Sequence, residues 1–260
     1  MSETFPELFD VIEYIHKHLD EPLSLEQLAR YAAYSPNYFN QKFKNTIGLP
    51  PLYYISSLRL QKAKDMLLHT PLSVRDIAME IGQQSLGTFT TRFTQKVGVS
   101  PSAFRHSIDN ADQQMHAFRR ISKWRTNPGS SEQIPSLTGT VLADEPFQGF
   151  VLIGLFAKPI PEGIPLYGTM LPGLGEYYMY NVKPGRYYLM ATSVSWTFRA
   201  TDCLLPYTTL RTRSHDPVVI DPLAPIINKN IMLHPPRLDD PPILISLPLL
   251  MSRLLKANSL

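Results

Sequence analysis

Apolar residues between residues 23 and 105 recur at helical spacing, and the same pattern occurs twice, about fifty residues apart. The first copy reads LSLEQLARYAAYSPNYFNQKFKNTIGLPP, and the second reads LSVRDIAMEIGQQSLGTFTTRFTQKVGVSP. Positions three and four apart share one face of a helix, so each copy predicts two short amphipathic helices around a tight turn. Two copies are too few for a solenoid, and the repeat therefore predicts a paired helix-turn-helix module.

Residues typical of helix ends delimit these predicted helices. Ser24 with Gln27, and Ser73 with Asp76, have the spacing of a capping box, in which a hydroxyl and a side chain three residues later satisfy each other's backbone donors. The second helix of each copy is expected to follow a serine and to end before a glycine, at Ser35 and Gly48 and at Ser85 and Gly98.

The second helix of each copy has an aromatic inner face and a polar outer face. Phe39 with Phe43, and Phe89 with Phe93, are four residues apart and are expected in the core. Asn and Gln pair with adenine in the major groove, Thr contacts a thymine methyl group, and Arg binds guanine or phosphate. The alternative is an ordinary solvated face. The DNA-contact candidates are Asn37, Tyr38, Asn40, Gln41 and Lys44, and then Leu86, Thr88, Thr91 and Arg92.

The segment from Phe9 to Arg105 resembles the DNA-binding domain of AraC/XylS-type transcriptional regulators. The resemblance rests on both copies, on the linking stretch YYISSLRLQKAKDMLLHTPLSVRDIA and on the closing GVSPSAFR. In that family two helix-turn-helix lobes are joined by a long helix, and both recognition helices enter successive major grooves. The resemblance implies base contacts at Asn37, Asn40, Gln41, Leu86, Thr88 and Thr91, with Arg92 close to the DNA backbone.

The second copy departs from the family pattern at two positions. Gln83 follows the turn glycine, where the family has an aromatic residue, and Gly87 weakens the second recognition helix. These departures leave open a nucleoid-type binder with little sequence preference. In the linking stretch, Arg59 is expected in a structural pairing, whereas Lys62 and Lys64 are expected in solvent.

Charge separates the chain into three parts. Residues 1–30 hold 2 Lys/Arg and 7 Asp/Glu, whereas residues 36–126 hold 13 Lys/Arg and 5 Asp/Glu. The positive surplus of the second part coincides with the predicted DNA-reading helices, where phosphate neutralisation requires it. Residues 127–260 hold 10 of each sign and 17 of the 24 prolines, so their charge gives no reason to bind DNA.

The region after residue 136 has a β pattern. Short runs rich in Val, Leu, Tyr and Thr are bounded by Pro and Gly, namely TGTVLA, GFVLIGLF, LYGTML, EYYMYNV and RYYLMATSV. The last two runs predict a hairpin across Lys183, Pro184 and Gly185. The five runs together predict a β-sandwich. GEYYMYNVKPGRYYLMA also resembles the strand–turn–strand of transthyretin-like domains. The tyrosines of these runs are expected to be structural, with a ligand surface as the alternative.

The histidine, cysteine and glycine residues of the sequence show no pattern of an active site. The seven histidines are scattered, the single Cys203 has no metal-ligand neighbours, and no phosphate-binding glycine loop is present. We therefore expect no enzyme, no cofactor and no metal. The apolar tail, PPILISLPLLMSRLLKANSL, is too short to span a bilayer, and Pro248 is expected to interrupt any helix there. It is expected to pack on the sandwich, with a dimer contact as the alternative.

These patterns predict a multidomain chain, α then β. An all-α double helix-turn-helix domain is expected at residues 1–108, a basic helix extension and linker at 109–136, and a β-sandwich-like effector, partner or dimerisation domain at 137–260. The predicted function is sequence-specific transcription regulation in the cytoplasm. Expected partners are double-stranded DNA, RNA polymerase, a small-molecule effector or protein at the C-terminal domain, and a second copy, but no membrane. A ligand- or partner-binding β module that merely carries the repeat stays open.

Overall fold

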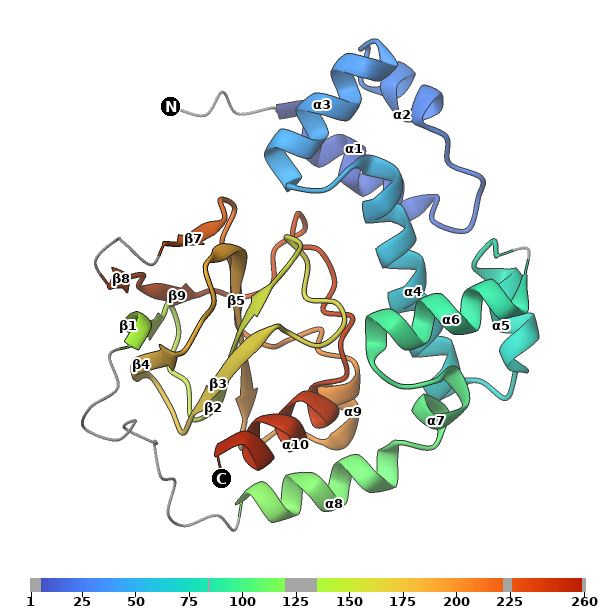
Figure 1. Cartoon of the computed structure of the whole chain (residues 1–260). Helices are drawn as coiled ribbons and strands as arrows, with labels where there is room; N and C mark the ends of the chain where they lie inside the picture. The colour runs from blue at the N-terminus through green and yellow to red at the C-terminus, as the bar shows by residue number, and fades with distance from the viewer. Residues whose placement is uncertain (1–5, 84, 120–134, 222–225, 259–260) are drawn as a thin grey trace. The chain divides into compact units, whose positions relative to one another are not determined.

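The computed structural model describes residues 6–83, 85–119, 135–221 and 226–258. The chain divides into two compact units (Figure 1). The first comprises Met1–Gln95, Val99–Arg105 and Arg237–Leu244, and the second comprises Lys96–Gly98, His106–Pro236 and Ile245–Leu260. The first unit is helical and the second contains the strands, which confirms the expected order of α followed by β. The exact domain boundaries given above stay a prediction.

Seven helices form the repeat and its flanks. They are α1 (Pro6–Lys17), α2 (Leu25–Tyr31), α3 (Pro36–Ile47), α4 (Pro51–His69), α5 (Val74–Glu80), α6 (Leu86–Val97) and α7 (Pro101–Arg105). Helices α2 and α3 form lobe 1, helices α5 and α6 form lobe 2, and α4 runs between them (Figure 1). The repeat in the sequence is therefore a repeat of structure.

The predicted helix ends are confirmed, although Ser35 precedes α3 without making a side-chain capping hydrogen bond. The Ser24 hydroxyl accepts from the Gln27 backbone N–H at 3.2 Å, and the Gln27 carbonyl oxygen accepts from the Ser24 N–H at 2.8 Å. Ser73 and Asp76 make the same reciprocal pair in lobe 2. Gly48 and Gly98 have left-handed backbones, with φ values of 79° and 92°. Glycine adopts this conformation without the steric penalty that a Cβ atom imposes, so both helices end where the sequence predicts.

The turns of the two lobes share a left-handed residue but differ in its type. Gly82 has φ 74° in lobe 2, whereas the equivalent Ala33 in lobe 1 has φ 57°. A residue with a Cβ atom is strained in this region by about 1–2 kcal/mol. Lobe 1 therefore carries a small backbone strain that lobe 2 avoids.

Two sheets and the helices α8 (Ile108–Arg119), α9 (Ala200–Leu204) and α10 (Leu247–Asn258) lie in the described part of the second unit. One sheet has the order β4-β1-β8, with β9 also paired to β1, and the other has the order β3-β2-β5-β6, with β7 also paired to β5. The strands are β1 (Pro135–Ala143), β2 (Gly149–Phe156), β3 (Tyr167–Leu171), β4 (Gly175–Tyr180), β5 (Gly185–Ser195), β6 (Arg211–Arg213), β7 (Val218–Ile220), β8 (Ile227–Asn228) and β9 (Ile231–Leu233).

Alternate residues of both sheets meet in one apolar core. Val141 and Tyr177 enter it from the first sheet, and Ile153 and Leu189 enter it from the second. This is the side-chain arrangement of a sandwich, in which the inward faces of two sheets interdigitate. The similarity of this region to transthyretin-like domains stays a prediction.

The predicted hairpin between the two tyrosine-rich strands is wrong. β4 pairs with β1, whereas β5 pairs with β2, β6 and β7, so the connection at residues 181–184 passes from one sheet to the other. Alternation fixes which side chains of a strand face the core, but it does not choose the partner strand. Tyr177 of β4 and Tyr187 of β5 therefore reach the same core from opposite sheets.

The apolar tail forms a helix on the sheet, and the expectation that Pro248 interrupts it is wrong. Pro248 is the second residue of α10, and a first-turn residue has no intrahelical N–H partner to lose. Leu254 of α10 lies over Gly168 of β3, where a Cβ atom would come within 2.9 Å of the leucine. All eight residues of β2 are buried.

The basic extension is in part helical, because α8 ends at Arg119. The rest of the predicted linker, up to residue 134, lies outside the described residues. Within the described part of the chain, no helix has the length and apolar character needed to cross a membrane. Nor do the described His, Cys, Asp and Glu side chains form a group of three or more that could hold a metal ion.

Candidate DNA-binding surface

The recognition helix of lobe 1 buries one face and exposes the candidate residues on the other. Phe39, Phe43 and Ile47 are fully buried on its inner side. The helix contains no acidic residue, so its outer face presents only amides, hydroxyls and cations. Of the predicted DNA contacts on α3, four are exposed and Asn40 is partly buried; the four are Asn37, Tyr38, Gln41 and Lys44.

Lobe 2 repeats this division. Phe89, Phe93 and Val97 are fully buried. The helix is likewise free of acidic residues, and its predicted DNA contacts are all exposed, namely Leu86, Thr88, Thr91 and Arg92. Ser85 caps this helix, since its hydroxyl accepts from the Thr88 N–H at 3.4 Å. Gly87 is the second residue of α6 rather than an interior one, so its cost to the helix is smaller than the sequence suggests.

A cation on each recognition helix reaches back to the residue that follows the turn. In lobe 1, Lys42 Nζ lies 5.3 Å from the ring centroid of Tyr34 and 5.5 Å from that of Tyr38, and it donates to the Tyr38 hydroxyl at 3.4 Å. In lobe 2, Arg92 donates to the Gln83 side-chain oxygen at 3.4 Å. Both cations are thus oriented by neighbours on their own lobe.

Burial lowers the pKa of Lys42, but its contacts with the two tyrosines raise it, and the net shift is upward from the usual lysine value. The amine therefore stays protonated at neutral pH, as a phosphate contact requires. Lys42 is not among the DNA contacts predicted from the sequence. Its position four residues after Tyr38 on one helix is the signal that identifies it.

Two arginines fix the loops that precede the first helix of each lobe. Arg59 donates to the carbonyl oxygens of Leu19, at 3.1 Å, and Glu21, at 2.6 Å. Desolvation lowers the pKa of Arg59, and the negative charge of Asp20 opposes that shift. Its predicted structural pairing is therefore present. Arg105 plays the matching part in lobe 2, donating to the carbonyl oxygens of Leu67 and Leu72.

The expectation that both lysines of the linking helix lie in solvent is wrong. Lys62 is partly buried and pairs with Asp20. Lys64 is fully buried, and its ammonium donates to the carbonyl oxygen of Ile243 at 3.1 Å and lies 5.7 Å from the ring centroid of Phe104. Residues of both lobes and of the segment Arg237–Leu244 surround α4, so no face of this helix is left wholly to water.

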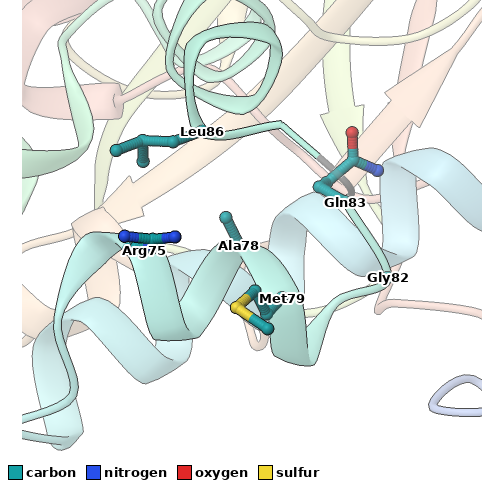
Figure 2. A pocket seen from close by; sticks show the side chains of 6 residues that line it. All are labelled: Arg75, Ala78, Met79, Gly82, Gln83 and Leu86. Atoms are coloured by element: carbon teal, nitrogen blue, oxygen red, sulfur yellow. The ribbon is translucent and has the colours of Figure 1, made fainter.

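Lobe 2 has a pocket beside the start of its recognition helix. The pocket has a volume of about 590 Å³ and is lined by Arg75, Ala78, Met79, Gly82, Gln83 and Leu86. Figure 2 shows Leu86 on one side of this space and Arg75 and Ala78 on the other. Met79 and Leu86, which are 66% and 44% exposed, place two apolar side chains at this pocket.

The candidate residues of the β-rich unit do not form one surface. Tyr177 and Tyr187 are buried in the sandwich core, and burial raises the pKa of Tyr177, whose hydroxyl donates to the Lys229 carbonyl at 2.7 Å. Tyr178 is exposed and Tyr188 is partly buried. Cys203 is fully buried, with its sulfur 3.6 Å from that of Met115. Tyr177, Tyr187 and Cys203 are therefore structural residues of the core.

Comparison with known proteins places the repeat in a family. Residues 28–107 match a family model described as a helix-turn-helix domain. YobQ of Bacillus subtilis, an uncharacterised HTH-type transcriptional regulator, is 37% identical over 97 residues, which cover 37% of this chain and 40% of that protein. AdaA of the same organism, a bifunctional transcriptional activator and DNA repair enzyme, is 36% identical over 95 residues, which cover 36% of this chain and 45% of that protein.

The chain thus spans less than half the length of these two relatives. Among solved structures, a transcriptional regulator from Chromobacterium violaceum with an AraC-type DNA-binding domain is 26% identical, with a TM-score of 0.38, and the match covers 39% of this chain and 91% of that one. The matched range, residues 28–107, contains the recognition helices of both lobes. Residues 28–107 form a helix-turn-helix domain of the AraC type.

Proposed function

We propose that this chain is a transcription regulator that binds two successive major-groove sites through α3 and α6. The observation that carries the proposal is the pair of equivalent recognition helices, both free of acidic residues, with aromatic inner faces and exposed polar outer faces. Groove-reading helices need donors and acceptors for base edges together with cations for phosphates. The relatives that share this domain are named as transcriptional regulators.

The proposed base contacts differ between the lobes. On α3, Asn37, Asn40 and Gln41 provide amides that pair with adenine, while Tyr38 and Lys44 contact the DNA backbone. The corresponding part of α6 has hydroxyl and apolar groups, with base contacts by Leu86, Thr88 and Thr91 and a backbone contact by Arg92. We infer that lobe 1 contributes most of the discrimination between sequences.

The β-rich unit is proposed to modulate this activity. A small-molecule effector, a protein partner or a second copy of the chain would bind there, and RNA polymerase would be contacted by the DNA-bound protein. We assign no enzymatic activity, because Cys203 is enclosed in the core beside Met115. A protein that acts on bacterial genes works in the cytoplasm, which is the location we propose.

The test is a selection of genomic DNA fragments on the purified full chain, at near-physiological salt with competitor DNA. We expect two enriched boxes with centres about ten base pairs apart, because the two helices dock one helical turn apart. Enrichment of no sequence, despite salt-sensitive binding, would favour a binder without sequence preference. The double variant Asn40→Ala, Gln41→Ala should lose the first box.

A matched control uses amides outside the proposed surface. Asn110 and Gln113 are exposed on α8, and their double replacement by alanine should leave both boxes intact. If both double variants lose the same box, the effect is not specific to α3 and the proposed contacts are wrong. Loss of the box in the α3 variant alone supports them.

A further inference from the structure

The recognition helices of the two lobes begin with different residue types. Lobe 1 begins α3 with Pro36 and Asn37, whereas lobe 2 begins α6 with Leu86 and Gly87. Leu86 is exposed, although burial of its apolar side chain would be favourable. Water is a poor solvent for such a group, so an apolar contact in the bound state would recover that free energy.

A second exposed apolar side chain lies next to Leu86. Met79 of α5 lines the same pocket, and the structurally equivalent residue of lobe 1 is the cation Arg30. Ala78 and Gly82 also line this pocket. Lobe 2 thus has a recess bordered by two exposed apolar side chains, Met79 and Leu86, where lobe 1 has Arg30 and Pro36.

The residue after the turn differs between the lobes in type and in contacts. In lobe 1 that residue is Tyr34, whose ring centroid lies 5.0 Å from that of Tyr38. In lobe 2 it is Gln83, whose side chain accepts a hydrogen bond from Arg92 on α6. The departure from the family pattern at Gln83 therefore coincides with a pocket beside the recognition helix.

A positive charge borders this apolar recess. Arg75, the second residue of α5, is exposed and lines the pocket opposite Leu86 (Figure 2). The equivalent residue of lobe 1 is Glu26, which has the opposite charge. A cation beside an apolar recess complements DNA, in which a phosphate lies at the edge of the groove and a thymine methyl group projects into it.

We propose that the lobe 2 pocket receives the 5-methyl group of thymine, with Leu86 as the residue that determines specificity and Arg75 as the phosphate contact. The proposal rests on the proposed function, because it assigns the base that the second recognition helix selects. Thymine is the base whose major-groove edge carries a methyl group. The second half-site is therefore thymine-rich, whereas the amides of α3 select adenine through hydrogen bonds.

Removing only the methyl group tests this directly. Two random duplex libraries, one synthesised with thymine and one with uracil in its place, are selected on the full chain. In the thymine library we expect an enriched first box and a thymine-rich second box. In the uracil library the first box should persist, while the second-box preference disappears. Each lost methyl contact should weaken binding about fourfold.

Two leucine variants separate a methyl contact from a general loss of apolar surface. Leu86→Ala should abolish the thymine preference in the second box and make the thymine and uracil duplexes bind equally. Leu72→Ala removes a similarly exposed leucine (40% exposed) from the loop before α5 and should change neither box. Arg75→Gln should weaken binding to all sequences and reduce the salt dependence by about one phosphate contact.

The outcomes distinguish this inference from the proposed function. A second box that is equally enriched in both libraries, or that contains no thymine, overturns the inference while the regulator proposal stands. Loss of the first box together with the second in the uracil library also overturns it, because the methyl effect is then not confined to lobe 2. Absence of any box in either library overturns the proposed function itself.

Discussion

The two helix-turn-helix lobes have nearly the same interior and different exteriors. Their inner aromatic pairs have ring-centroid distances of 5.7 Å in lobe 1 and 5.6 Å in lobe 2, and each pair contacts a third ring at 5.7 Å. The rings concerned are Phe39, Phe43 and Tyr54 in lobe 1, and Phe89, Phe93 and Phe104 in lobe 2. The interior is alike because close packing restricts which side chains fit a buried site.

The exteriors differ because no packing restricts them. Lobe 1 has Tyr34 after its turn and amides on its recognition helix, whereas lobe 2 has Gln83 and an apolar residue, Leu86. The guanidinium that holds the preceding loop comes from α4 in lobe 1 and from α7 in lobe 2, as Arg59 and Arg105. The comparison indicates that one scaffold was retained while two different reading surfaces were built on it.

The largest expected effect tests whether the interiors are equivalent. Phe43→Ala and Phe93→Ala should each reduce the free energy of unfolding by about 3–5 kcal/mol, because each leaves a cavity in a fully buried site. Urea unfolding of the full chain, followed by circular dichroism, measures both. Leu52→Ala, at a residue of α4 that is 49% exposed, is the control and should cost less than about 0.5 kcal/mol. A difference of more than about 2 kcal/mol between the phenylalanine variants would show that the lobes are not equivalent.

The next effect tests whether the exteriors differ in function. Gln41 and Thr91 occupy equivalent positions on α3 and α6. Gln41→Ala should lose about ten- to hundredfold in discrimination between the selected site and a scrambled one, as expected for a two-point contact with a base. Thr91→Ala removes a single hydrogen bond and should lose less than about tenfold. Fluorescence anisotropy titrations give both values, and equal losses would contradict the assignment of most specificity to lobe 1.

Exchanging alanine and glycine at the two turns should change the free energy of unfolding in opposite directions. Ala33→Gly relieves a left-handed backbone and should stabilise the chain by up to about 1 kcal/mol, whereas Gly82→Ala introduces that strain and should destabilise it by about 1 kcal/mol. A Cβ atom at Gly82 would lie 3.5 Å from Arg59 Nη1, an ordinary contact, so the cost is backbone strain rather than a clash. Thermal unfolding of the two variants measures the difference, and shifts of the same sign would refute the turn comparison.

The smallest effect concerns the start of α6. Gly87→Ala should stabilise the chain by a few tenths of a kcal/mol and by no more than about 1 kcal/mol, because alanine loses less backbone entropy in a helix. The added Cβ atom would have Ser85 Oγ at 3.9 Å as its nearest neighbour, so there is space for it. Urea unfolding measures the gain. A loss of stability would mean that the first turn of α6 is not helical in solution.

Local signals in the sequence predicted much of the helical unit. Capping pairs, turn glycines and the four-residue spacing of the phenylalanines depend on neighbours within a few residues, and each is found where it was expected. The outward position of most candidate contact residues followed for the same reason, since the outer positions of a helix follow from its inner ones. Arg75 was missed because its place beside the pocket depends on α6, a different helix. Lys42 was missed although its spacing from Tyr38 is local, because its contact with Tyr34 joins the helix to the preceding turn.

In the β-rich unit, local sequence patterns did not predict which strands pair. On β4, Tyr177 is buried and Tyr178 is exposed, as strand alternation requires of neighbouring residues. The sequence pattern gave the wrong partner for that strand, because strand pairing is a contact between distant segments that a short pattern does not encode. The effect of Pro248 likewise depends on where α10 begins, because a proline in the first turn of a helix is tolerated and one in its interior is not.

The sequence by itself determined the repeat, the helix ends and the inner and outer faces of both recognition helices, since these follow from spacing and backbone chemistry along a continuous stretch. Only the tertiary structure decided that Lys64 is buried, that β4 and β5 belong to different sheets, and that a pocket lies beside Leu86. Each of these depends on which distant segment covers a residue, and solvent exposure is a property of the assembled fold rather than of the local chain.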